Sequence, residues 1–217
     1  MYKRQSHKTG LKGYRLAAYS ELPRTGLPEL FEGRQDYDEY VGALQRSGVI
    51  PDESHIWWAM RPSMRHPTLE LRAPDTCTLV DDAVAIASLY RCLTRHLYLR
   101  PHLSKEVAAV ERAIAVENKW RAQRYGTDCI FASKDGPVTI SELLSRVIDD
   151  IAEDAAALNC AAEVEHCRTI VARGSSAEFQ LRAYHDNSGD IAAVSRWIAT
   201  STTSGTSAPI GSVSAPS

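Results

Sequence analysis

Several features that would assign a protein of 217 residues to a class at once are absent from this sequence. No uncharged apolar run approaches the ~18 residues needed to cross a bilayer. The most apolar stretch, Leu79 to Leu99, is interrupted by two aspartates and two arginines. The opening MYKRQSHKTG is basic but no apolar segment follows it, so it is not a secretory signal. We therefore expect a cytoplasmic protein with no membrane partner.

Excess charge and paired cysteine motifs are absent as well. Lysine and arginine number 25 against 27 acidic residues, a net charge of -2, which gives no reason to expect a nucleic-acid partner. The five cysteines never form a C-x-x-C pair, and we interpret them as reduced thiols, mostly in the core: Cys77, Cys92, Cys129, Cys160 and Cys167. His166, close to two of them, completes no zinc-site spacing.

The common catalytic signatures are also missing. There is no glycine-rich phosphate loop, no G-x-S-x-G and no H-E-x-x-H in the sequence. A P-loop enzyme or a serine-triad enzyme therefore has no support.

The composition that remains, 44% hydrophobic and 24% charged, is typical of a globular domain. Apolar residues at three- and four-residue steps predict helices over residues 37–45, 79–99, 104–124, 140–158, 160–173, 177–185 and 191–199. Three of these have capping residues at their start, namely Thr78, Ser104 and Thr139. Strands are expected over 55–61, 68–73, 129–132 and 138–140, the last two as a small hairpin.

These elements predict a helix-rich α+β fold with a few antiparallel strands. We expect one domain over residues 1–200. Residues 201–217 are rich in serine and threonine and carry no charge, which predicts a disordered tail.

The segment from Trp57 to Asp75 is the most informative for chemistry. Strand alternation places Thr68, Glu70 and Arg72 on one face. A Glu-x-Arg pair suits phosphoryl transfer, because the carboxylate can hold magnesium and the guanidinium can bind phosphoryl oxygens. The alternative is a cross-strand salt bridge on a solvated face, which is common and contributes little.

Other candidates carry similar alternatives. Arg61, Arg65 and His66 form either an anion-binding rim or an exposed polar loop. Of the neighbouring Trp57 and Trp58, we expect one in the core and the other beside a pocket.

The stretch ENKWRAQRYG, Glu117 to Gly126, places Asn118, Arg121 and Arg124 at three-residue steps near a helix end. There the arginines either complement the helix dipole or complete a pocket for an anionic substrate.

The stretch WWAMRPSMRHPTLELRAPDTCTLVDD resembles the glutamate–cysteine ligase type 2 group of carboxylate–amine ligases. The matching positions are Trp57, Trp58, Arg61, Pro67, Thr68, Glu70, Arg72, Asp75 and Thr78. LPRTGLPELF and ENKWRAQRYG also look like that family, so the resemblance runs from about Gly10 to Trp197.

The resemblance implies a glutamine-synthetase-like fold and the cofactors ATP and Mg²⁺. It implies phosphorylation of the γ-carboxylate of glutamate, followed by attack of an amine, typically that of cysteine, to form an amide. Glu70 would be a metal ligand, Arg72 the catalytic phosphate-binding residue, and Arg61 a second cofactor-binding residue. Trp58, Asn118, Trp120 and Arg121 would contact substrate.

Family members also have an N-terminal half with more strands and most of the metal-binding carboxylates. We therefore expect this chain to be the C-terminal portion of such a ligase, inactive or nearly so by itself.

Two other functions remain open at this point: a non-catalytic helical interaction module on the same scaffold, and a nucleic-acid binder using the arginines, which the acidic net charge disfavours. The sequence identifies neither the amine acceptor nor the oligomeric state, and a homo-oligomer is compatible with it.

Overall fold

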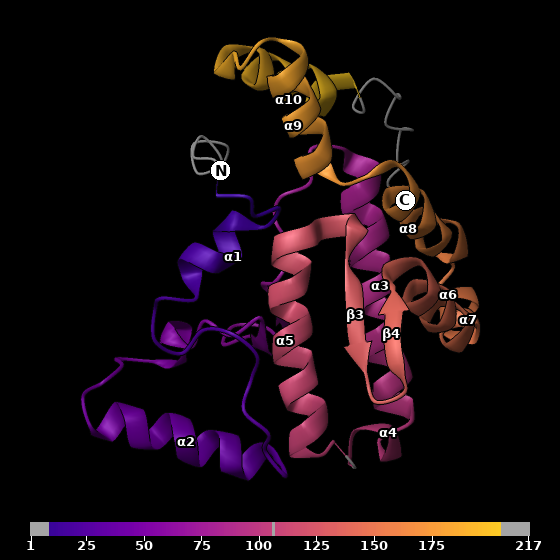
Figure 1. The fold of residues 1–217 in the computed structure, drawn as a ribbon. Helices are drawn as coiled ribbons and strands as arrows, with labels where there is room; N and C mark the ends of the chain where they lie inside the picture. Colours follow the sequence, from indigo (N-terminus) through magenta and orange to yellow (C-terminus); the bar gives the residue numbers. More distant parts are fainter. Residues whose placement is uncertain (1–8, 106, 205–217) are drawn as a thin grey trace, which may run out of the picture.

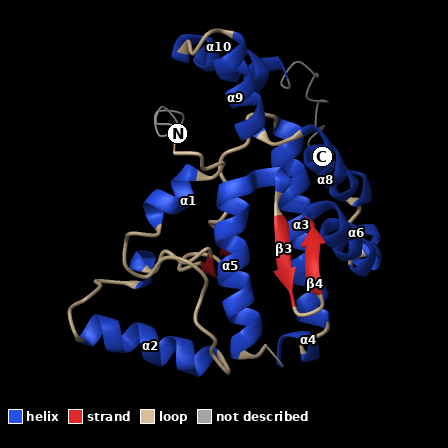
Figure 2. Ribbon diagram, in the orientation of Figure 1, coloured by secondary structure: helices blue, strands red, loops and turns tan. Residues whose placement is uncertain are grey.

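The computed structural model describes residues 9–105 and 107–204. Figures 1 and 2 show the arrangement of its elements. The N-terminal part holds two helices and one small sheet: α1 (Tyr14–Tyr19), α2 (Arg34–Arg46), β1 (Met60–Pro62) and β2 (Leu69–Leu71). The remainder holds α3 (Val80–Leu99), α4 (His102–Lys105), α5 (Ala109–Tyr125), β3 (Ile130–Ser133), β4 (Gly136–Thr139), α6 (Ile140–Asp150), α7 (Ala152–Ala157), α8 (Ala161–Arg173), α9 (Ser176–Asp186) and α10 (Ile191–Ser204).

Both sheets in the described residues are antiparallel pairs. In the first, Arg61 lies opposite Glu70, and in the second, Phe131 lies opposite Val138. The helix-rich α+β class with a few antiparallel strands is therefore confirmed, while the glutamine-synthetase-like fold stays a prediction.

The main core lies between α3, α6, α7 and α8. Its buried members are Cys92, Ile148, Ile151, Ala155, Cys160 and Val164. The sulfur atoms of Cys92 and Cys160 lie 3.5 Å apart, and burial beside this second thiol raises the pKa of Cys92 to about 12. All five cysteines are free, as expected, and four of them are buried.

A second core of aromatic and aliphatic side chains belongs to the N-terminal part. Trp58 stacks on Tyr40 with ring centroids 5.7 Å apart, and Tyr37, Val41 and Ile50 close around it. This cluster attaches α2 to the segment that leads into β1.

Several predicted helices are confirmed, but some of their limits were wrong. The helix predicted over 79–99 is confirmed as α3, which begins one residue later, at Val80. The predicted Thr78 cap is wrong, because Leu79 is the N-cap residue and the Thr78 hydroxyl lies 2.5 Å from that of Ser176. The helix expected from Ser104 begins instead at Ala109, after the short α4. The carboxylate of Glu111 accepts a hydrogen bond from the backbone N–H of Ala108, so one of the free N–H groups at the helix start has a partner.

The continuous helix expected over 140–158 is two helices. The Thr139–Glu142 capping box is confirmed at its start, but Ile151 leaves helical geometry with φ -97° and ψ 9°. The stripe of apolar residues continues through this break without interruption. The hydrophobic periodicity of the sequence therefore does not reveal that the helix ends there.

The first two strands are shorter than predicted, since His55 lies in a 3-10 turn and pairing covers only three residues on each side. Residues before Tyr37 include a helix, α1, that the sequence did not predict. Residues 201–204 of the expected tail belong to α10, and 205–217 lie outside the described residues. No helix in the described part of the chain has the length and apolarity that a bilayer crossing needs.

Candidate functional site

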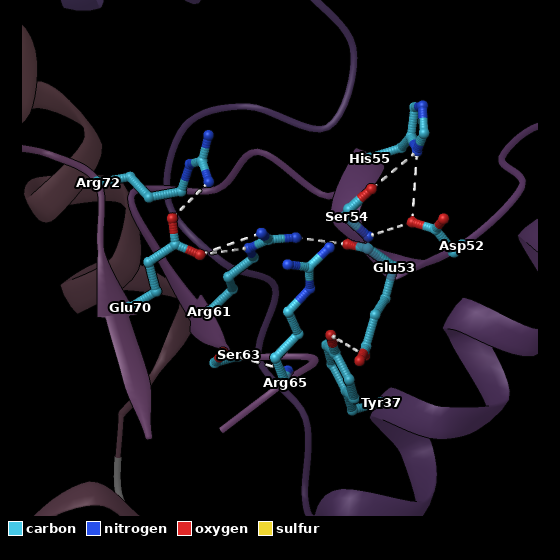
Figure 3. A network of polar contacts seen from close by, with 10 residues as sticks. All are labelled: Tyr37, Asp52, Glu53, Ser54, His55, Arg61, Ser63, Arg65, Glu70 and Arg72. Carbon is cyan, nitrogen blue, oxygen red and sulfur yellow. Dashed lines mark hydrogen bonds and ion pairs between the residues drawn. The ribbon is translucent and has the colours of Figure 1, made fainter. Parts of the chain in front are cut away.

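The predicted Glu70–Arg72 pair lies at the end of β2. Arg72 Nη1 is 2.6 Å from Glu70 Oε1, so the prediction that both side chains project to the same side is confirmed. Figure 3 shows the Glu70 carboxylate held between the guanidinium groups of Arg72 and Arg61. The guanidinium groups of Arg61 and Arg72 carry two positive charges and the Glu70 carboxylate carries one negative charge, so the three side chains together have a net charge of +1.

Arg61 reaches the other carboxylate oxygen from β1. Its Nη2 and Nε lie 3.0 and 3.1 Å from Glu70 Oε2, which is the cross-strand salt bridge that the sequence also allowed. Its Nη1 donates to the Glu53 carbonyl at 2.6 Å, and the residue is only 9% exposed. Arg61 is therefore largely committed to holding the sheet together. Beneath it, burial and the Glu53 carboxylate raise the pKa of Tyr37 to about 12.

Arg72 is held from behind by Arg15 of α1. The Arg15 Nε is 2.5 Å from Asp75 Oδ1, and its Nη2 donates to the carbonyls of Arg72, Ala73 and Pro74. Sequence reasoning missed this contact because it depends on α1, which lies in a stretch without visible periodicity. The effect is to fix the backbone of Arg72 while its side chain stays one-quarter exposed.

The two tryptophans divide as the alternation predicted. Trp58 is 3% exposed within the aromatic core, so its ring contacts protein on both faces rather than an opening. Trp57 is partly exposed and lines a small pocket together with Arg15, Arg72 and Lys119. Trp57 therefore lies beside the candidate site. Trp58 lies in the aromatic core and packs beneath the segment that leads into β1.

Asn118 and Arg121 lie on the face of α5 that meets the hairpin. The Asn118 amide exchanges two hydrogen bonds of 2.8 Å with the backbone of Ala132, as a neighbouring strand would. Arg121 Nε donates to the Ile130 carbonyl at 2.5 Å. Their polar groups thus attach β3 to α5, and the structure does not bring them to Glu70.

Trp120 lies elsewhere on α5 and is 49% exposed. It lines a cavity of about 480 Å³, to which Lys119 also contributes. Because Lys119 also lines the small pocket that Arg72 borders, the two openings share a wall. Of the predicted substrate contacts, Trp120 is therefore the one that faces an open space near Arg72.

The magnesium prediction meets a specific difficulty. Both oxygens of Glu70 are engaged by arginines, and the described residues contain no group of three or more His, Cys, Asp or Glu that could hold a metal. Magnesium in proteins is usually held by one or two carboxylates, with water and phosphate completing its shell. The residues present here do not by themselves form such a site.

Comparison with known families gives one match that spans most of the chain. The description Glutamate-cysteine ligase family 2 (GCS2) matches residues 4–196. This agrees with the resemblance seen in the tryptophan pair and the Glu-x-Arg triplet.

Individual relatives give the same assignment. A protein of Bradyrhizobium diazoefficiens is 90% identical over 200 residues, which are 92% of this chain and 47% of that protein. One from Bradyrhizobium sp. (strain ORS 278) is 70% identical over 92% of this chain and 49% of its own length. One from Rhodospirillum rubrum is 45% identical over 81% of this chain and 46% of its own. Each is named "Putative glutamate--cysteine ligase 2", and this chain spans about half the length of each.

Proposed function

Since the chain belongs to the glutamate–cysteine ligase family 2, we propose that it forms part of the catalytic unit of an ATP-dependent carboxylate–amine ligase. The whole ligase would join the γ-carboxylate of glutamate to an amine such as that of cysteine. The family match supports the class of ligase, and the partly exposed Arg72, beside the Glu70 carboxylate, supports the placement of the reacting anions.

The proposed reaction has two steps. An oxygen of the γ-carboxylate attacks the terminal phosphorus of ATP, the bond to the ADP oxygen breaks, and an acyl phosphate forms. The amine nitrogen then attacks the carbonyl carbon, the bond to phosphate breaks, and the nitrogen loses a proton to give the amide. Both steps gather negative charge in one place, so the site needs cations that are already in position.

Arg72 supplies such a cation in this proposal. Its backbone is fixed by Arg15 and its guanidinium by Glu70, so little rotational freedom is lost when it binds phosphoryl oxygens. Arg61 acts through Glu70, since its own donors are used within the sheet. ATP would bring magnesium. Because arginines engage both oxygens of Glu70, the carboxylates that hold the metal would come from outside the described residues.

The observation that carries the proposal is the Arg72 side chain, partly exposed and held in place by Glu70 and Arg15. Binding of magnesium–ATP tests the proposal. We expect Arg72→Ala to weaken binding at least tenfold by titration calorimetry. A charge-assisted hydrogen bond worth about 1.5–3 kcal/mol is lost.

The matched control is Arg196→Ala, an exposed arginine of α10 that pairs with Asp190, which should bind as the parent does. Equal affinity in the parent and Arg72→Ala, or no nucleotide binding by the parent, would instead favour the non-catalytic interaction module. Circular dichroism of each variant checks that the fold is intact.

A further inference from the structure

The outer edge of β2 has no backbone partner among the described residues, where the sheet consists of β1 and β2 alone. Leu69 lies opposite Pro62, which has no N–H. This pair therefore cannot exchange the two hydrogen bonds of a bonded antiparallel pair, so the N–H and C=O of Leu69 face away from β1. By alternation, those of Leu71 do the same. No hydrogen bond within the described part of the chain uses these four groups, and the edge is open to another strand.

A groove of about 830 Å³ lies between this edge and α3. On the sheet side it is lined by residues 62–63 and 66–69. On the helix side it is lined by one face of α3, at steps of three and four: Tyr90, Arg91, Thr94, Arg95 and Tyr98. Leu69 is 43% exposed and Tyr98 is 81% exposed. The groove therefore leaves both a strand edge and large apolar and aromatic side chains open to solvent.

The charges that line the groove have one sign. Its described lining residues include no aspartate or glutamate, and they include three arginines: Arg34, Arg91 and Arg95. Arg34 pairs with Asp38, and Arg95 pairs with the buried Asp154. Among the described residues no carboxylate lies within 4.0 Å of Arg91, in contrast to these two arginines. A segment that fills the groove therefore gains from carrying a carboxylate that pairs with Arg91.

The family comparison indicates which polypeptide this is. The relatives extend beyond the part that they share with this chain by about half of their length. An open strand edge binds an extended backbone, since main-chain hydrogen bonds provide the affinity. A second copy of this chain fits the groove less well, because pairing β2 with the β2 of another copy would place two sets of the same arginines at one interface. The unshared part of the relatives is therefore the favoured occupant.

We propose that the groove between β2 and α3 binds an extended, acidic segment of the polypeptide that the relatives have beyond the shared part. The segment adds a strand to the free edge of β2, and one of its carboxylates pairs with Arg91. Its apolar side chains cover Leu69 and Tyr98. The proposal rests on membership of the family and not on the ligase reaction, so nucleotide binding can fail while the proposed interface stands.

The test produces the 217-residue chain together with the unshared part of the Bradyrhizobium diazoefficiens relative, which carries an affinity tag. We expect the two polypeptides to co-purify, and native mass spectrometry to show one copy of each in the complex. Hydrogen exchange should show the amides of Leu69 and Leu71 exchanging at least about tenfold more slowly than in the chain alone. Failure to co-purify, or a complex in which these amides exchange as before, overturns the proposal.

Two variants locate the interface. Leu69→Pro removes the outward N–H without removing a hydrogen bond to β1, and Arg91→Glu reverses a charge in the groove. Each should lower the amount of chain retained by the tagged partner at least about tenfold. Arg146→Glu, at an exposed position of α6 outside the groove, is the matched control and should be retained as the parent is.

Retention of both groove variants at the parent level contradicts the proposal. Size-exclusion chromatography of the chain alone tests the other occupant. A dimer of this chain that is lost in Leu69→Pro would assign the edge to a second copy and would also overturn the proposal. Circular dichroism checks that each variant is folded.

Discussion

Glu70 is the residue through which the small N-terminal sheet and the candidate site depend on each other. Its carboxylate is the described anion that compensates Arg61, which is 9% exposed. Replacing it by glutamine removes the negative charge opposite that guanidinium and leaves it only neutral acceptors, such as the Glu53 carbonyl. We expect Glu70→Gln to lower the free energy of unfolding by about 1.5–3 kcal/mol, the usual value of a hydrogen bond to a charged group.

Urea unfolding at neutral pH measures this change. Glu117→Gln is the control, since Glu117 is 55% exposed in its side chain and lies 3.9 Å from Arg121; we expect a change below about 0.5 kcal/mol. Equal losses in both variants would show that Glu70 contributes no more than a surface charge.

The candidate site was predictable from sequence only where local geometry decides it. The alternation of a strand placed Glu70 beside Arg72 correctly, because that relation involves neighbours in one segment. Arg15 and Lys119 were missed, since their contacts depend on α1 and the following loop folding against α5. Asn118 was predicted for substrate contact on its position in a motif, yet it hydrogen-bonds the hairpin.

At the scale of elements, Asp154 joins α7 to the end of α3. Its side chain is fully buried and bonds Arg95, His96 and Arg100. Burial acts to raise the pKa of this carboxyl, but the hydrogen bonds from His96 and Arg95 outweigh it, so the pKa lies below its ordinary value. The charged form is therefore the stabilising one.

We expect Asp154→Asn to cost about 3 kcal/mol at neutral pH, because breaking a buried ion pair leaves uncompensated cations. A group whose pKa falls on folding stabilises the protein above its unfolded pKa, about 3.9 for aspartate. The contribution is lost as the pH falls through the lower folded value. The stability gap between parent and variant should thus be constant above about pH 5 and narrow under acid, and a gap that widens on acidification would contradict the assignment.

The sequence predicted which helices exist better than it predicted the residues at which they begin and end. Amphipathic stripes indicated α3 and α6 because buried faces impose their period on the sequence. The break at Ile151 and the late start of α5 leave the same apolar residues in place, so tertiary contacts decided them. The stretch before Tyr37 has too few apolar repeats for α1 to be visible, and α1 has no buried residue.

For the whole molecule, stability is expected to be uneven. The core between α3, α6 and α8 is apolar and deeply buried, whereas β2 has no buried residue and pairs with β1 over three positions. Two-stranded sheets are marginal by themselves. Hydrogen exchange followed by mass spectrometry should show the amides of β1 and β2 exchanging well before those of α3 and α8. Equal protection in the two regions would indicate a single cooperative unit.

The adjacent thiols of Cys92 and Cys160 give this molecule a built-in reporter. Both sulfur atoms lie in the core, where a reagent in solvent does not reach them, and Cys92 keeps its proton at neutral pH because burial raises its pKa. Half-exposed Cys77 should be alkylated first under native conditions. The rate at which the buried pair is alkylated would then report how often α3 and α8 separate. No probe has to be added to the chain for this measurement.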